Sequence, residues 1–211
     1  MICPPHHQKN RAMPADGRSH LARLARKTDE WFHRASAALL GQVACRIGCS
    51  HCCIGLFPVT RLDAELLHEG LAQLPSDKRL IIQQRARAQV SALEAAYPTL
   101  LASRSLDGWS DGEIDHAVSR FDQDRCPALS DAGLCSLYAY RPLTCRSMGI
   151  PTQVGQMVEG ACCVQTFVPI VRVSESLRSE EQELASLESA ALTAHGPSAQ
   201  GEEILLPYAF L

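Results

Sequence analysis

Aromatic side chains are scarce in this 211-residue sequence, at 5%, and no apolar run approaches the roughly 18 residues that indicate a membrane span. The formal net charge is only -3, which gives no reason to expect non-specific attraction to nucleic acid. We therefore predict neither a membrane span nor a nucleic-acid partner. The sequence also lacks a glycine-rich phosphate loop, a G-x-S-x-G elbow and a dinucleotide-binding fingerprint, so no catalytic residue is assigned.

The N-terminal stretch lacks the apolar core of a secretion signal, so we expect a cytoplasmic chain. Residues 1–18 hold three prolines and show no hydrophobic periodicity, which predicts a disordered tail. A chain of this length is sufficient for one domain with a sizeable core. We therefore expect a single cysteine-cluster domain with flanking helices over residues 19–211.

Cysteine, in contrast, is abundant: the chain has ten, and nine of them fall in three tight groups. The first group has the pattern C-x3-C-x2-C-C and consists of Cys45, Cys49, Cys52 and Cys53. This spacing allows a tight turn, with Gly48 inside it, to bring three sulfurs within roughly 2.3 Å of one metal ion. Adjacent side chains diverge, so Cys53 indicates a second site, a bridging role or a buried thiol.

Disulfides are the main alternative to metal binding for such clusters. They persist in oxidising compartments, whereas clustered cysteines in a reduced cytosolic chain more often bind metal or act in catalysis. His51, within the first group, is interpreted either as an alternative metal ligand or as an exposed turn residue.

The second group has three cysteines, spaced by a turn signal and a proline. The turn signal at residues 131–133 predicts a small hairpin across which Cys126 and Cys135 face each other. Pro142 suits the first position of a helical turn, which would bring Cys145 inward. The third group is the pair Cys162-Cys163. Two arginines near the second group, Arg141 and Arg146, either offset the negative charge of a thiolate–metal centre or point to water.

Apolar residues recur at three- and four-residue intervals over most of the remaining chain, which indicates helices. The predicted helices cover residues 19–43, 60–74, 76–97, 110–122 and 174–194, with the second and third forming an antiparallel pair. The segment at residues 204–207 is expected to pack back on the body. The predicted fold class is mainly α, with a small irregular or β-hairpin cysteine-rich region that binds metal.

Charge is unevenly distributed along the chain. Residues 9–46 contain eight Lys and Arg against three Asp and Glu, while residues 174–211 contain one Arg against seven Glu. The two ends either pair across the fold or form two separate solvated helix faces, and we favour the solvated faces.

Taken together, the first and second cysteine groups resemble the putative zinc- or iron-chelating domain family, also called the YkgJ-like cysteine cluster proteins. The resemblance covers roughly residues 44–165 and includes Cys126-Pro127, Gly133, Tyr138, Arg141-Pro142 and Cys145-Arg146. It implies a small, mainly helical protein whose cofactor is zinc or iron, a 4Fe-4S cluster being one form of the latter. The proposed metal ligands are Cys45, Cys49, Cys52, Cys53, Cys126, Cys135, Cys145, Cys162 and Cys163.

Two functions are compatible with this resemblance. The first is a metal-binding protein whose centre is structural or regulatory. The second is an iron–sulfur-dependent oxidoreductase or methyl-transfer enzyme, because one relative in the family is the flagellin lysine N-methylase. Thiolates bind zinc and iron–sulfur clusters with similar spacing, so the cysteine pattern leaves both metals open.

Overall fold

The computed structural model describes residues 20–39, 49–154, 157–159, 173–196 and 202–211. The predicted tail at residues 1–18 lies outside the described residues, as do Gly48, Cys45, Cys162 and Cys163. The described part is mostly helical, which confirms the predicted fold class. Its helices are α1 (His20–Ala38), α2 (Arg61–Gln73), α3 (Ser76–Ala96), α4 (Thr99–Ala102), α5 (Asp111–Arg120), α6 (Leu143–Ser147) and α7 (Glu175–Ala194).

The described strands are short and form two antiparallel pairs. Strand β1 (Pro58–Thr60) pairs with β4 (Glu203–Leu205), and β2 (Thr152–Val154) pairs with β3 (Met157–Glu159). Three 3-10 turns, η1 (His51–Cys53), η2 (Tyr138–Tyr140) and η3 (Leu206–Phe210), complete the described elements. No described helix is long and apolar enough to cross a membrane.

Side-chain caps define several of the predicted helix starts. Thr60 and Ser110 each form a capping box with the acidic residue three positions later, and Ser174 accepts a hydrogen bond from Leu177 N–H. The helix predicted at residues 76–97 is α3, and its N-cap is Pro75, without a side-chain hydrogen bond. The proline ring restricts the backbone angle φ of Pro75, so this helix begins at a fixed backbone position even though no side chain caps it.

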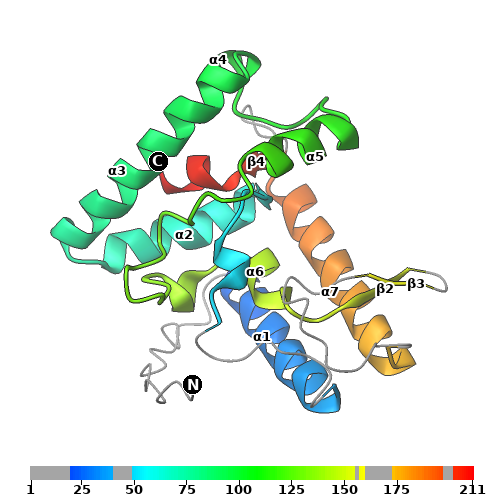
Figure 1. The fold of residues 1–211 in the computed structure, drawn as a ribbon. Coiled ribbons are helices and arrows are strands. Elements are labelled where there is room, and N and C mark those ends of the chain that lie inside the picture. Colours follow the sequence, from blue (N-terminus) through cyan, green and yellow to red (C-terminus); the bar gives the residue numbers. More distant parts are fainter. Residues whose placement is uncertain (1–19, 40–48, 155–156, 160–172, 197–201) are drawn as a thin grey trace.

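The C-terminal segment packs between α2 and α3 and contacts both (Figure 1). Leu206 and Phe210 of η3 are buried in one cluster with Leu67 and Leu71 of α2 and Ile82 of α3. The prediction that this segment packs back on the body is therefore confirmed. The two helices of the predicted pair share this buried cluster, and η3 packs against both of them.

Helices α1 and α7 lie side by side (Figure 1, blue and orange). Trp31 is buried and its Nε1–H donates to Leu177 O at 3.1 Å. Lys27 pairs with Glu183 at 3.4 Å and Arg34 with Glu180 at 2.6 Å. The interpretation of two separate solvated faces is therefore wrong for these residues, although the ion pairs remain largely exposed and are worth little individually.

Candidate metal centre

The first and second cysteine groups are joined by backbone hydrogen bonds. Cys126 N–H donates to Cys53 O at 2.8 Å, and Gly55 N–H donates to Asp124 O at 2.7 Å. An antiparallel bridge between Ile54 and Arg125 lies between these two bonds. Gly55 has φ +103°, a conformation that favours glycine and turns the chain just after η1. This short ladder holds the first group beside the second.

The second group forms the predicted tight turn. Ser130 N–H donates to Leu134 O at 2.8 Å, an antiparallel bridge joins Leu129 to Cys135, and Gly133 has φ +74°. Cys126 and Cys135 therefore stand on the two arms of one small hairpin-like loop, as the Asp-Ala-Gly signal predicts.

Cys145 is carried by α6, which begins at Leu143, one residue later than predicted, with Pro142 as its N-cap. The helix is anchored by Asp63, a fully buried residue of α2 whose Oδ1 accepts a hydrogen bond from Leu143 N–H. Burial raises the pKa of the Asp63 carboxyl to about 7. One carboxylate thus caps α2 through Thr60 and also fixes the start of the helix that holds Cys145.

All six described cysteines line one cavity of about 260 Å³. They are Cys49, Cys52, Cys53, Cys126, Cys135 and Cys145. Its other walls include Phe32, His33 and Ser36 from α1, and Phe57 and Phe210 from the central core. The fold therefore gathers both described cysteine groups, far apart in sequence, around a single space.

Among these thiols, the negative charge of one thiolate raises the pKa of its neighbours. This effect links all pairs within a set of four: Cys52, Cys126, Cys135 and Cys145. Burial is the largest cause that raises the pKa of the Cys126 thiol, to about 12, and it also raises the pKa values of Cys135 and Cys145. A hydrogen bond with Cys53 and burial raise the pKa of Cys52. Without a cation among them, these thiols are held in the neutral form.

The protein also supplies groups that favour thiolates. Hydrogen bonds from the Ala128 and Leu129 backbone lower the pKa of Cys126, against the larger effect of burial. A hydrogen bond from the Leu137 backbone and the charges of two arginines act in the same direction on Cys135. Such N–H donors and nearby cations commonly support metal-bound thiolates.

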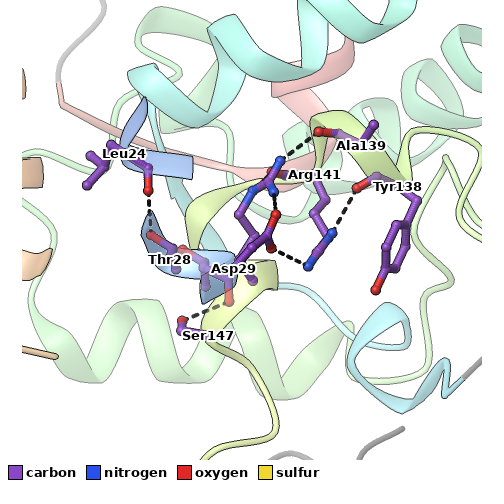
Figure 2. A network of polar contacts seen from close by, with 9 residues as sticks. Leu24, Thr28, Asp29, Tyr138, Ala139, Arg141 and Ser147 are labelled. Atoms are coloured by element: carbon purple, nitrogen blue, oxygen red, sulfur yellow. Dashed lines mark hydrogen bonds and ion pairs between the residues drawn. The ribbon is translucent and has the colours of Figure 1, made fainter. Parts of the chain in front are cut away.

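The two arginines are Arg141 and Arg146, and both border the cavity. Figure 2 shows how Asp29 of α1 bridges them: its Oδ1 accepts from Arg141 Nη2 at 2.6 Å, and its Oδ2 pairs with Arg146 Nη1. Arg146 also donates to Ala139 O at 2.7 Å and to Arg141 O at 3.0 Å. The Arg141 guanidinium lies over the Tyr138 ring, 4.1 Å from its centre. The arginines therefore lie beside the thiols and do not point only to water.

Within the described residues, no three His, Cys, Asp or Glu side chains are already arranged as a metal-binding group. The thiols surround a shared cavity and are not in contact with one common point. His51 is exposed, as one of its two interpretations expects, and it is not among the described residues that line the cavity. The remaining predicted ligands, Cys45, Cys162 and Cys163, lie outside the described residues.

Four residues of α1 belong to this site and were missed from the sequence: Asp29, Phe32, His33 and Ser36. None of the four carries a local motif that marks it as part of the site. Residues three and four positions apart lie on one face of a helix, and this spacing is the only sequence signal that groups them. Which face meets the cysteines depends on long-range packing.

The fold and the site together define a class of protein: a mainly helical chain whose clustered cysteines converge on one cavity from separate segments. The family model described as putative zinc- or iron-chelating domain matches residues 44–163, more than half of the chain. The chain belongs to this family. Comparison with curated proteins and with solved structures gives no match.

Proposed function

We propose that this chain binds zinc or iron through thiolates of its clustered cysteines, in a centre built at the shared cavity. The observation that carries the proposal is that Cys52, Cys126, Cys135 and Cys145, which come from three separate segments of the chain, line one cavity. A divalent cation bound among these thiolates attracts each of them, and this attraction offsets their mutual repulsion. Thiolate sulfur is a ligand that zinc and iron–sulfur centres favour.

The surroundings of the thiols support this proposal. A centre with four thiolates and one divalent ion carries net negative charge. Arg141 and Arg146 border the cavity, and their positive charges favour the thiolate of Cys135, although the carboxylates of Asp29 and Asp63 lie nearby. The backbone hydrogen bonds to Cys126 and Cys135 favour the same charge state. The donor set therefore fits a soft cation.

The full proposed ligand set is larger than one closed zinc site needs. Cys49 and Cys53 line the same cavity, and Cys45 with Cys162 or Cys163 would extend the set. Four thiolates complete the coordination of one structural zinc ion. About eight thiols suit two such ions, or one 4Fe-4S cluster with one zinc ion.

We also propose that residues 19–211 form one domain, of which the family-matched segment is the centre. Leu21 and Leu24 of α1 are buried in one cluster with Leu62 and Leu66 of α2 and Leu143 of α6. This cluster joins a helix outside residues 44–163 to the helix that carries Cys145.

Purification without oxygen or chelators, followed by elemental analysis, sulfide assay and absorption spectroscopy, tests the metal proposal. We expect at least one zinc or iron per chain, and Cys126→Ser should lose at least half of it. Cys3→Ser, outside the matched segment, is the control and should keep all of it. A parent protein with neither metal would disprove the proposal.

The same spectrum separates the two forms of the centre. A colourless protein with zinc indicates a structural or regulatory site, whereas a brown protein with iron and acid-labile sulfide indicates a cluster. The oxidoreductase or methyl-transfer hypothesis requires the second outcome, an iron–sulfur cluster.

A further inference from the structure

Ser36 of α1 has a buried hydroxyl with no hydrogen-bond partner among the described residues. Some hydroxyls within helices of this protein bond to the carbonyl four residues earlier, as Thr28 does at 3.0 Å and Ser186 at 2.9 Å. Ser36 lies in the same helix as Thr28 and makes no such bond. Because a buried polar group without a partner destabilises the fold, an acceptor outside the helix is expected.

The register of α1 directs Ser36 toward the cysteines. Asp29, seven residues earlier and so two turns away on the same face, binds Arg141 and Arg146 (Figure 2). His33 lies between them, and both His33 and Ser36 border the cavity that the six described cysteines line.

The acceptors available at this cavity are mainly sulfurs. The two arginines are donors only, and their N–H groups already bind Asp29 and backbone carbonyls. A thiolate bound to a metal, in contrast, is an electron-rich acceptor, and protein donors commonly bond to it from outside the coordination shell.

We infer that Ser36 Oγ–H donates a hydrogen bond to a metal-bound thiolate of this centre, so that α1 is part of the metal site and not only a flanking helix. Ser36 is then a positioning residue that draws electron density from the sulfur and orients it. The inference rests on the proposed metal-binding function. It also adds a residue from outside the family-matched segment to the site.

The test compares Ser36→Ala with Ser36→Thr, which keeps the hydroxyl, and with Ser186→Ala, which removes a helical hydroxyl on α7. Zinc affinity is measured by competition with a chromophoric chelator, and the sulfur-to-metal charge-transfer band is recorded on cobalt-loaded protein. We expect Ser36→Ala to bind zinc about tenfold more weakly, the low end of the effect of losing such a partner. Its cobalt band should move to longer wavelength, while the other two variants match the parent.

Helix stability separates this role from a purely structural one. Alanine is the better helix former and removes an unpaired hydroxyl, so the helical signal of metal-free Ser36→Ala should melt at the parent temperature or up to about 4 °C higher. A structural role would lower both melting temperature and affinity. Parent-like zinc affinity and cobalt spectrum in Ser36→Ala would overturn the inference alone, whereas a parent that binds neither metal overturns the proposed function as well.

Discussion

The Asp29 carboxylate is shared by two guanidinium groups that the chain brings from more than a hundred residues away. The Arg146 side chain is only 1% exposed, whereas that of Asp29 is 30% exposed. Burial lowers the pKa of Arg146, and the negative charge of Asp29 acts against that shift. A buried guanidinium without its counter-charge is strongly unfavourable. This ion pair therefore contributes more to the stability of the fold than the partial exposure of Asp29 suggests.

Asp29→Asn should therefore lower the free energy of unfolding by about 2–3 kcal/mol, somewhat less than for a fully buried pair. Denaturant unfolding of the metal-loaded protein measures this loss. Glu180→Gln, which breaks the exposed pair with Arg34, is the control and should cost at most about 1 kcal/mol. An equal loss of unfolding free energy in the two variants would show that the Asp29 bridge stabilises the protein no more than an exposed ion pair does.

The raised pKa values of the thiols predict how metal affinity depends on pH. Burial raises the pKa of Cys126, Cys135 and Cys145, so these groups are protonated at neutral pH in the absence of metal. Metal binds the thiolate, so each coordinating thiol must release a proton. Affinity should therefore rise with pH by roughly tenfold per unit for each released proton, while the free thiol remains protonated.

Zinc competition titrations between about pH 6 and pH 8 measure this dependence, and calorimetry in buffers of different ionisation enthalpy counts the protons. Two or more protons per ion are expected. Affinity that does not change with pH would show that thiols are not the ligands.

At the scale of elements, the distance between α2 and the loop that leads to Cys145 is set by Gly70. A Cβ at this position would lie 2.6 Å from the Cβ of Tyr140 in η2. Glycine inside a helix is ordinarily unfavourable by about 1 kcal/mol relative to alanine. Its use here allows η2, which lies between Cys135 and Cys145, to pack directly on α2.

Gly70→Ala should consequently destabilise the protein by about 1–3 kcal/mol, because the added methyl group displaces η2, even though alanine favours helix. Gly112→Ala in α5 is the matched control, since nothing lies within 4 Å of its added Cβ, and it should be neutral or stabilising. Thermal unfolding measures both. Tyr140→Gly, which removes the Cβ and ring atoms that the added methyl group would meet, should restore part of the loss in the Gly70 variant, and its failure to do so would contradict the proposed clash.

Local signals were sufficient to predict most helices but not how they meet. The capping boxes at Thr60 and Ser110 and the stripe through Ile82 lie within a few residues, so the sequence alone reveals them. The bridge from Asp29 to the arginines and the position of η3 between α2 and α3 depend on contacts between distant residues. The cysteine pattern identified the six described thiols that line one cavity, whereas the contribution of α1 to that cavity was missed because it depends on such distant contacts.

At the scale of the whole molecule, the apolar clusters are built mainly by the longer helices and η3, although Cys126 and Cys135 pack against one of them. The main clusters are built by α2, α3, α1, α7 and η3. The segment from Cys126 to Ile150 contributes isolated anchors, such as Ala128 and Leu137, and its longest described helix has five residues. Its order is therefore expected to depend on additional cross-links, and a metal ion held by thiolates can supply them.

A strong chelator, or Cys145→Ser, should melt the cysteine region while most of the helical signal survives. Apparent binding free energies of structural zinc are on the order of 10 kcal/mol and contribute to folding when the metal-free site is disordered. The helices have buried stripes of their own, for example Ile82, Ala86, Val90 and Leu93 of α3, and should persist. Limited proteolysis should then cut between Cys126 and Cys145, with circular dichroism little changed, and Cys3→Ser should behave as the parent. If Cys145→Ser keeps full metal content and the protease resistance of the parent, the second cysteine group acts in packing and does not bind the metal.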